Sequence, residues 1–328
     1  MVNGVLSGGV AGRPQGSYSP AAMKPISAPG RLLGLCLAVA SLGAVAEALR
    51  AETPPALDRG AYLFAAAGCA GCHTDVKAKG PPLAGGRALK TPFGTFYGPN
   101  ITPDPEHGIG GWSDADFLGA LRDGVAPDGA HYFPAFPYTS FTKMSDADLL
   151  ALKAYIFSLP AVAQPSRPHE LSFPFAWRWP LGVWKRLYFT PGPFVPDAAR
   201  GAAWNRGAYL VEAVAHCREC HTPRDWLGGR DDSRAFAGTP DGPEGEKVPN
   251  ITPDPATGIG GWSRAQRLRA LKIGLLPDGD FVGALMGEVV EQSTGRLTDS
   301  DIEAIAVYLE SVPAVANPAA KATAAGFD

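Results

Sequence analysis

The pentapeptide Cys-x-x-Cys-His occurs twice, at Cys69–His73 and at Cys217–His221. Two thiols at this spacing lie on one turn of the chain, so each can add to a vinyl group of the same porphyrin, with the next side chain beneath the iron. A redox Cys-x-x-Cys pair or a structural zinc site would tolerate any residue after the second cysteine. Histidine in both copies therefore predicts two covalently bound c-type haems. The expected thioether residues are Cys69, Cys72, Cys217 and Cys220, and the expected axial ligands are His73 and His221.

The sixth position of each iron decides between electron transfer and chemistry on a bound ligand. Met144 and Met286 are the methionines that follow the predicted signal segment, one after each haem motif. We expect them to be the sixth ligands. Counted from the Pro-Asp-Gly that occurs in both copies, Met286 corresponds to Phe136. Met144 instead aligns with Leu297, because each immediately precedes the cap of the last helix. For the first haem, His131 and an open or water-bound iron therefore stay as alternatives to Met144.

A ligating imidazole needs an acceptor for its other ring N–H. In the first copy we expect a carbonyl of Gly80–Pro82, which lies a short distance along the chain from His73. The second copy has no matching proline pair, so no acceptor is predicted there.

One unit is written twice in the chain. Residues 100–112 recur at 250–262 with two differences, and Gly60–Leu63 recurs as Gly207–Leu210 before the second haem motif. We therefore expect two homologous haem domains at 52–165 and 201–320, mainly α-helical and with long Pro/Gly-rich loops. A length of 328 residues suits two domains of roughly 100–200 residues each.

Each copy is predicted to contain three helices. The first ends at the haem motif, the second begins at Ser113 or Ser263, and the last begins at Ser145 or Thr298, all with capping-box patterns. On the last helix, apolar residues recur at helical spacing and predict a core face. These residues are Leu149, Leu152, Ile156 and Leu159 in the first copy and Ile302, Ile305 and Leu309 in the second.

Gly60 and Gly207, which lack a side chain, would let another helix cross closely. The expected partner is the last helix of each copy, at Tyr155 and Tyr308.

Residues 166–200 match nothing in the repeat and are rich in aromatic side chains. Large exposed apolar surfaces usually mark interaction sites, so this segment is a candidate docking surface for a protein partner or a membrane. The alternative is that it packs between the two domains and fixes their separation. The aromatic residues are Phe173, Phe175, Trp177, Trp179, Trp184, Tyr188 and Phe189.

Residues 1–51 read as a secretory signal peptide with an N-terminal extension, so that translation begins at Met23. Their apolar stretch is short for a bilayer span, and an uncleaved anchor is the alternative. Cys36 lies inside this stretch, so removal of the signal leaves only the four haem cysteines. We expect export to the periplasm.

Residues 321–328 are a tail. A net charge of −3 and a pI of about 6.1 argue against a nucleic-acid partner.

With these motifs in hand, the chain resembles a diheme class I cytochrome c. The Asn-Ile-Thr-Pro-Asp-Pro loop and the later Phe-Pro-Tyr and Lys-Met-Ser-Asp-Ala-Asp stretches are similar to the cytochrome c subunits of bacterial periplasmic dehydrogenases. The resemblance implies single-electron transfer from a quinoprotein, flavoprotein or molybdenum dehydrogenase towards the respiratory chain, through a downstream cytochrome, oxidase or quinone. It implies no catalysis by the chain itself and allows membrane-surface association.

One feature departs from this family pattern, because family members carry methionine within the Pro-x-x-Pro-Tyr stretch, where this chain has Phe136. It favours an alternative function, a diheme peroxidase or a thiosulfate-oxidising cytochrome that works at an open iron in the first domain.

Overall fold

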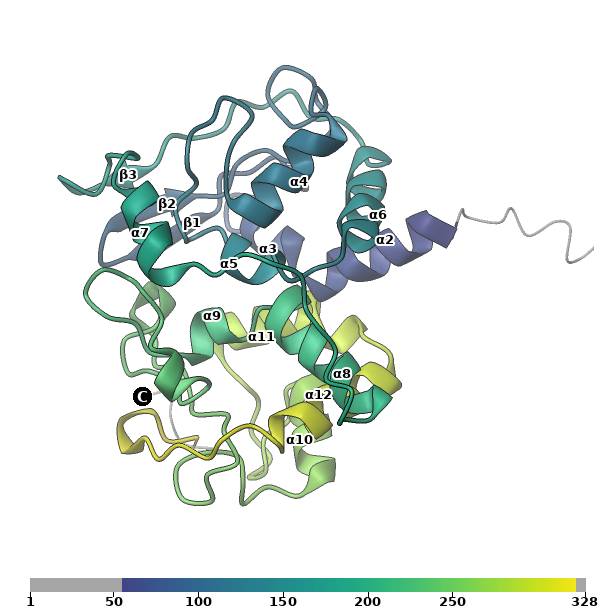
Figure 1. Ribbon diagram of the computed structural model, residues 1–328, viewed down its shortest axis with the longest axis vertical. Coiled ribbons are helices and arrows are strands. Elements are labelled where there is room, and N and C mark those ends of the chain that lie inside the picture. The colour runs from purple at the N-terminus through teal and green to yellow at the C-terminus, as the bar shows by residue number, and fades with distance from the viewer. Residues whose placement is uncertain (1–54, 323–328) are drawn as a thin grey trace, which may run out of the picture. The chain divides into compact units, whose positions relative to one another are not determined.

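The helices occur in two sets that follow the same order. The structure is a computed structural model, and it describes residues 55–322. The first set comprises α2 (Pro55–Ala66), α3 (Cys69–His73), α4 (Asp114–Asp123), α5 (Tyr138–Phe141) and α6 (Asp146–Phe157). The second comprises α8 (Ala202–Tyr209), α9 (Arg218–His221), α10 (Arg264–Ile273), α11 (Ala284–Gln292) and α12 (Asp299–Leu309). We call residues 55–165 the first half and residues 201–322 the second half; they occupy the upper and lower parts of Figure 1.

The expected signal segment 1–51, with Met23 and Cys36, lies outside the described residues, as do residues 323–328 of the tail. Within residues 55–322, no helix has the length and apolar content needed to cross a lipid bilayer.

The helix crossings predicted at two glycines are confirmed. α2 packs on α6, and α8 packs on α12 (Figure 1). A Cβ atom placed on Gly60 would lie 2.1 Å from the Ala151 carbonyl oxygen and 2.7 Å from Tyr155 Cβ. On Gly207 it would lie 1.9 Å from the Ala304 carbonyl oxygen. Real Cβ atoms do not approach this closely, so each crossing requires glycine.

The predicted helix starts are confirmed. Ser113 and Ser263 form complete capping boxes with Asp116 and Gln266 at the starts of α4 and α10. Ser145 and Thr298 also accept hydrogen bonds from backbone amides at the starts of α6 and α12. The apolar faces predicted on these last helices are buried, for example at Leu149, Leu152, Ile302 and Ile305.

The capping pattern of α6 and α12 differs from the prediction in one respect. The carboxylates of Asp148 and Asp301 do not close a capping box but accept hydrogen bonds from the other half. The Tyr62 hydroxyl of the first half donates to Asp301, and the Tyr209 hydroxyl of the second half donates to Asp148. The Tyr62 hydroxyl also accepts a hydrogen bond from the Thr298 backbone amide, and the Tyr209 hydroxyl accepts one from the Ser145 backbone amide, each at 3.2 Å. The two halves are therefore joined by a reciprocal pair of tyrosine–aspartate contacts.

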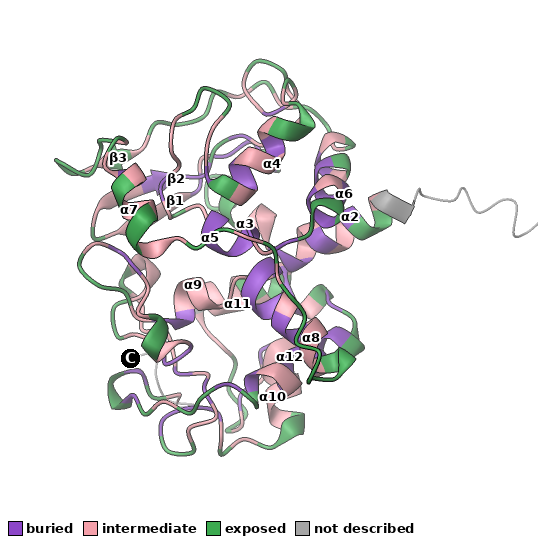
Figure 2. Cartoon of the chain, in the orientation of Figure 1, coloured by how far each residue is buried: buried purple, intermediate pink, exposed green. Residues whose placement is uncertain are grey.

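The two halves also share one hydrophobic core. Leu63 and Leu149 of the first half belong to the same buried cluster as Leu210, Val211 and Ile305 of the second. Figure 2 shows the buried α5 beside the helical segment that begins with α8, whose C-terminal end is buried. This segment continues as a π-helical turn over Leu210–Val214, in which every residue is buried. Burial of apolar surface from both halves thus stabilises them together.

Three short strands form an antiparallel sheet of order β1-β2-β3, which the sequence pattern does not predict. They are β1 (Ala88–Thr91), β2 (Gly94–Tyr97) and β3 (Glu170–Leu171). Ala88 pairs with Tyr97, and Gly94 pairs with Leu171. Strands of two to four residues are too short to show a clear alternation, and β3 is distant in sequence from its partner, so no local signal was available.

The segment 166–200 contacts both halves through α7 (Leu181–Tyr188). The Trp184 indole N–H donates to the Leu227 carbonyl in the second half at 3.0 Å. The Lys185 ammonium donates to the Gly124 carbonyl in the first half at 2.8 Å. Within this segment, α7 therefore packs between the two halves, which was the alternative to a docking surface.

The first part of the same segment is exposed instead. Phe173, Trp177 and Trp179 are 79%, 50% and 72% exposed. The rings of Phe173 and Trp177 lie 5.2 Å apart between centroids, and those of Trp177 and Trp179 lie 6.4 Å apart. These side chains form one aromatic cluster on the surface, which we call the aromatic turn.

The glycine crossings lead to a stability prediction. Gly60→Ala and Gly207→Ala should each lower the free energy of unfolding by about 1–3 kcal/mol, because the added methyl group forces the helices apart. Gly111→Ala is the matched control, since the nearest atom to its Cβ would be 3.9 Å away. Urea unfolding of the haem-loaded protein measures all three, and equal midpoints for Gly60→Ala and Gly111→Ala would contradict the close crossing.

Candidate haem sites

Each haem motif forms a single helical turn with an extended residue after it. α3 begins after Gly68, whose φ of 62° is left-handed, and is followed by Thr74 in an extended conformation. α9 begins after Cys217 and is followed by the extended Thr222. Residues three apart on a helix are neighbours on one face. The two cysteines of each motif therefore present their thiols to the same side, as attachment to one porphyrin requires.

The structure orients both motif histidines in the same way. His73 Nδ1 lies 2.8 Å from the Pro99 carbonyl oxygen, and His221 Nδ1 lies 2.8 Å from the Pro249 carbonyl oxygen. A carbonyl only accepts, so Nδ1 carries the proton and Nε2 keeps its lone pair for a metal. Burial lowers the pKa of both imidazoles, although the proline carbonyls oppose the shift. The neutral ring that an iron ligand must be is therefore favoured.

The prediction of an acceptor within Gly80–Pro82 is wrong, because the Pro99 carbonyl takes this role. Pro99 immediately precedes the repeated Asn-Ile-Thr-Pro loop. Within it, Asn100 Oδ1 accepts from the Thr102 amide at 2.9 Å, and Asn250 Oδ1 accepts from the Thr252 amide at 2.9 Å. Proline stands before this loop in both copies, and that recurrence was the signal available in the sequence.

No disulfide joins the motif cysteines within the described residues. Burial raises the pKa of all four thiols, to about 12 for Cys69 and Cys217 and to about 11 for Cys220. Before a group is attached, these side chains are therefore neutral near pH 7.

The donor set of each motif fits a covalently bound haem. Two thiols on one helical turn are followed by an imidazole whose Nδ1 is held by a proline carbonyl and whose Nε2 is available to a metal. This combination of residues is the one that c-type haem attachment requires.

The structure brings the two motifs together. The His216 Nε2–H, one residue before Cys217, donates to the Ala67 carbonyl at 3.2 Å, two residues before Cys69. The Phe141 ring of α5 lies 5.5 Å from the His216 ring between centroids. The Ser293 hydroxyl of the second half donates to the Ala66 carbonyl at 2.7 Å. Each motif therefore contacts the half that does not contain it.

A buried carboxylate lies within the second motif. Glu219 Oε1 accepts from the hydroxyls of Thr139 and Ser140 in the first half, at 2.7 and 2.8 Å. Burial opposes ionisation, but the guanidinium groups of Arg230 and Arg224 outweigh it and lower the pKa of Glu219 to about 2. The charge is thus retained at the seam between the halves.

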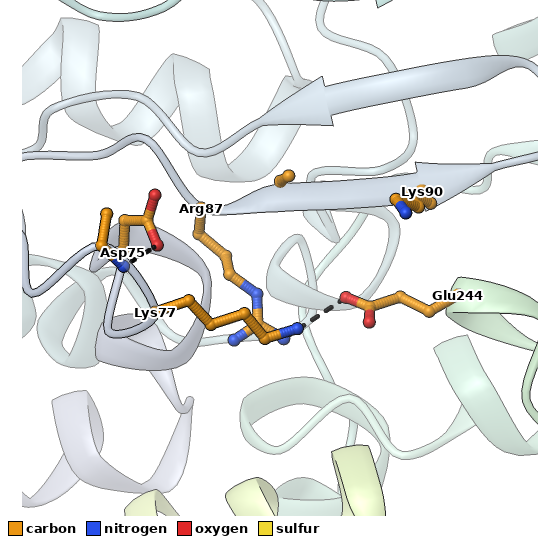
Figure 3. Close-up of a pocket in the computed structure, with 7 residues that line it drawn as sticks. Asp75, Lys77, Arg87, Lys90 and Glu244 are labelled. Carbon is orange, nitrogen blue, oxygen red and sulfur yellow. Dashed lines mark hydrogen bonds and ion pairs between the residues drawn. The ribbon is translucent and has the colours of Figure 1, made fainter.

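A polar hollow of about 420 Å³ lies beside the first motif (Figure 3). The buried Arg87 spans it, with Nη2 3.3 Å from Glu244 and Nη1 2.9 Å from Glu288, both in the second half. Asp75, two residues after His73, also lines the hollow. The charged side chains that line this hollow do not suit an apolar porphyrin. We therefore infer that its ion pairs join the two halves and that it does not bind haem.

The two methionines occupy different environments. Met144 is 0% exposed and belongs to the shared core, next to the start of α6. Met286 lies in α11 and is half-buried. The alternative ligand His131 has its Nδ1 3.0 Å from the Lys185 ammonium of α7.

Comparison with known proteins agrees with these sites. The cytochrome c family model matches residues 57–160, which include the first motif. A diheme cytochrome c-type protein of Cereibacter sphaeroides is 46% identical over 261 residues, which cover 78% of this chain and 86% of the relative.

Two further relatives are longer proteins. The cytochrome subunit of fructose dehydrogenase from Gluconobacter japonicus is 44% identical over 80% of this chain, and the cytochrome c subunit of gluconate 2-dehydrogenase from Pantoea cypripedii is 38% identical over 86%. The chain spans 54% and 65% of the lengths of these two subunits.

The aligned 261 residues exceed the length of either half, so the similarity extends over parts of both. Paired thiols on one helical turn, followed by a histidine whose Nε2 is free, are the attachment chemistry of c-type haem. On the geometry of these sites and on its match to the Cereibacter protein, this chain belongs to the cytochrome c family.

Proposed function

We propose that the chain is a diheme electron carrier in which each half holds one haem. Cys69 and Cys72 attach the first haem, with His73 as its axial ligand; residues 52–165 form the domain around it. Cys217 and Cys220 attach the second, with His221 and Met286 as ligands; residues 201–320 form its domain. A c-type haem supplies one-electron redox chemistry, while the chain binds it, orients its ligand and shields it from water.

The adjacency of the two motifs is the observation that carries this proposal. The His216–Ala67 hydrogen bond joins the segments that directly precede the two motifs, and the Phe141 ring of the first half packs on His216. The thiol of Cys72 is near enough to Cys220 to contribute to the raised pKa of Cys220, after the larger effects of burial, Arg224 and Glu219. Groups attached to these thiols would be close neighbours, and electrons would pass between them within one molecule.

The electron donor we propose is a dehydrogenase. The relatives described above are named as cytochrome subunits of fructose and gluconate dehydrogenases. By similarity, this chain would receive electrons from such an enzyme in the periplasm and pass them to a downstream cytochrome, oxidase or quinone. A diheme peroxidase or thiosulfate-oxidising function is not favoured, because these relatives are electron-transfer subunits.

A pulse experiment tests electron transfer within the molecule. When a pulse of reductant supplies less than one electron per protein, the electron should redistribute between the two haems at a rate that does not depend on protein concentration. The reason is that Ala67 and His216, which lie just before the two motifs, are in contact. Transient absorption, with the two haems distinguished by their spectra, follows the redistribution.

A variant of the seam serves as the comparison. Phe141→Ala should slow the redistribution while both haems remain attached, because it removes the ring packed on His216. A redistribution rate proportional to protein concentration would mean that electrons move between molecules, which contradicts the proposal.

We also propose that the aromatic turn, Phe173–Trp179, contacts the membrane surface. Its three most exposed rings form one cluster. From Leu171 to Pro196 the chain has no acidic residue. Of its three basic residues, Arg178 and Lys185 donate to backbone carbonyls of the first half, and Arg186 is exposed. Aromatic side chains next to basic ones are typical of segments that lie at the interface of anionic bilayers.

Vesicle co-sedimentation tests this contact. The haem-loaded protein should sediment with vesicles of phosphatidylglycerol and phosphatidylethanolamine, and the triple variant Phe173→Ser, Trp177→Ser, Trp179→Ser should not. Phe281→Ser is the matched control, because Phe281 is 60% exposed but lies outside the turn. Equal sedimentation of the triple variant and the native protein would exclude the turn as a membrane contact and leave it as a protein-docking surface.

A further inference from the structure

Met144 and Leu297 occupy the same structural position in the two halves. Each stands directly before the residue that caps the last helix, α6 or α12. The Met144 carbonyl accepts from Arg122 of α4 at 3.2 Å, and the Leu297 carbonyl accepts from Lys272 of α10. The following backbone amide is bound in both cases by a tyrosine hydroxyl of the other half.

The side chains at this position are also equally buried. Met144 is 0% exposed, Leu297 is 1% exposed, and both belong to the shared core. Leucine has no donor atom for a metal, so in the second half this position serves packing alone. Methionine is a common filler of such positions. The environment of Met144 is therefore that of a core residue.

The residue that corresponds in sequence to the second-half methionine is a phenylalanine in the first half. Met286 and Phe136 are at the same distance from the Pro-Asp-Gly that both halves contain. Phe136 packs within a group of aromatic rings, with centroids 5.5 Å from Tyr132 and 5.8 Å from Phe141. A phenyl ring offers no lone pair to an iron.

Two histidines that follow the first motif are held by other parts of the chain. His131 Nδ1 lies beside the Lys185 ammonium, and its Nε2 lies against Gly182, both in α7. His169 Nδ1 accepts from the Tyr97 amide at 3.1 Å, and its ring packs on Phe96. Both rings are thus directed to α7 and the sheet.

From these observations we propose that the first haem has no methionine ligand, and that the place of the missing thioether is open to a small exogenous ligand such as carbon monoxide. This inference rests on the proposed binding of one haem in each half. Because methionine ligation raises the reduction potential, the second haem is then the more oxidising of the two. Electrons would enter at the first haem and leave from the second.

Carbon monoxide titration of the reduced, haem-loaded protein tests this inference. The native protein should bind one equivalent for every two haems, and the red charge-transfer band of methionine-ligated ferric haem should integrate to one haem. Phe136→Met should abolish carbon monoxide binding and double the band. Met144→Leu should leave both readouts unchanged, because leucine occupies this place in the second half and the exchange nearly conserves volume.

Several results would overturn the inference. Loss of one charge-transfer band in Met144→Leu, with gain of a second equivalent of carbon monoxide, would make Met144 a ligand. Absence of binding by the native protein, with binding restored in His131→Ala, would make His131 the ligand. A haem content below two per chain, measured as the pyridine haemochrome, would contradict the proposed function itself. This result differs from those that would make Met144 or His131 a ligand, so the two kinds of failure can be distinguished.

Discussion

In each half, the carbonyl of one proline accepts the Nδ1 proton of the motif histidine at 2.8 Å. This hydrogen bond fixes the tautomer and the direction in which Nε2 points, and a ligand that can rotate binds iron less well. The repeated loop holds the carbonyl in place: Asn100 donates to the carbonyls of Val162 and Gln164, and Asn250 donates to that of Val315. The repeated loop that begins at Pro99 and at Pro249 therefore supports the hydrogen bond to the motif histidine in each half.

The two halves do not behave as separate modules joined by a linker. Tyr62 and Tyr209 each bind the capping region of the other half, and one hydrophobic cluster extends through both. The charged contacts follow the same arrangement, since Lys143 of the first half lies 2.9 Å from Glu212 of the second. Burial favours the neutral form of Glu212, but Lys143 and Arg218 outweigh it and lower the pKa of this carboxyl. The haem motifs are adjacent because these contacts fix the seam.

Local features of the sequence predicted much of this structure. The caps at Ser113 and Ser263 and the buried faces of α6 and α12 depend on residues within one or two helical turns of each other. The close crossings were visible from the missing side chains at Gly60 and Gly207, although their partners are distant in sequence. Long-range features were missed. The spacing Ser145–Asp148 is that of a capping box, but the Asp148 carboxylate instead accepts a hydrogen bond from Tyr209 of the other half. Each copy contains both a tyrosine and an aspartate at these positions. The sequence therefore does not reveal that the pairs form between the copies. The Pro99 acceptor was missed because it is 26 residues along the chain from His73, although its recurrence at Pro249 was visible.

The central claim is that two porphyrins are covalently attached, one beside each motif, within this single core. The intact mass of the exported chain, measured after denaturation, tests it most directly. The account predicts the mass of the polypeptide plus two haems, with one increment lost when Cys69 and Cys72 are both replaced by alanine and the other lost when Cys217 and Cys220 are replaced. A native mass with one increment or none would contradict it.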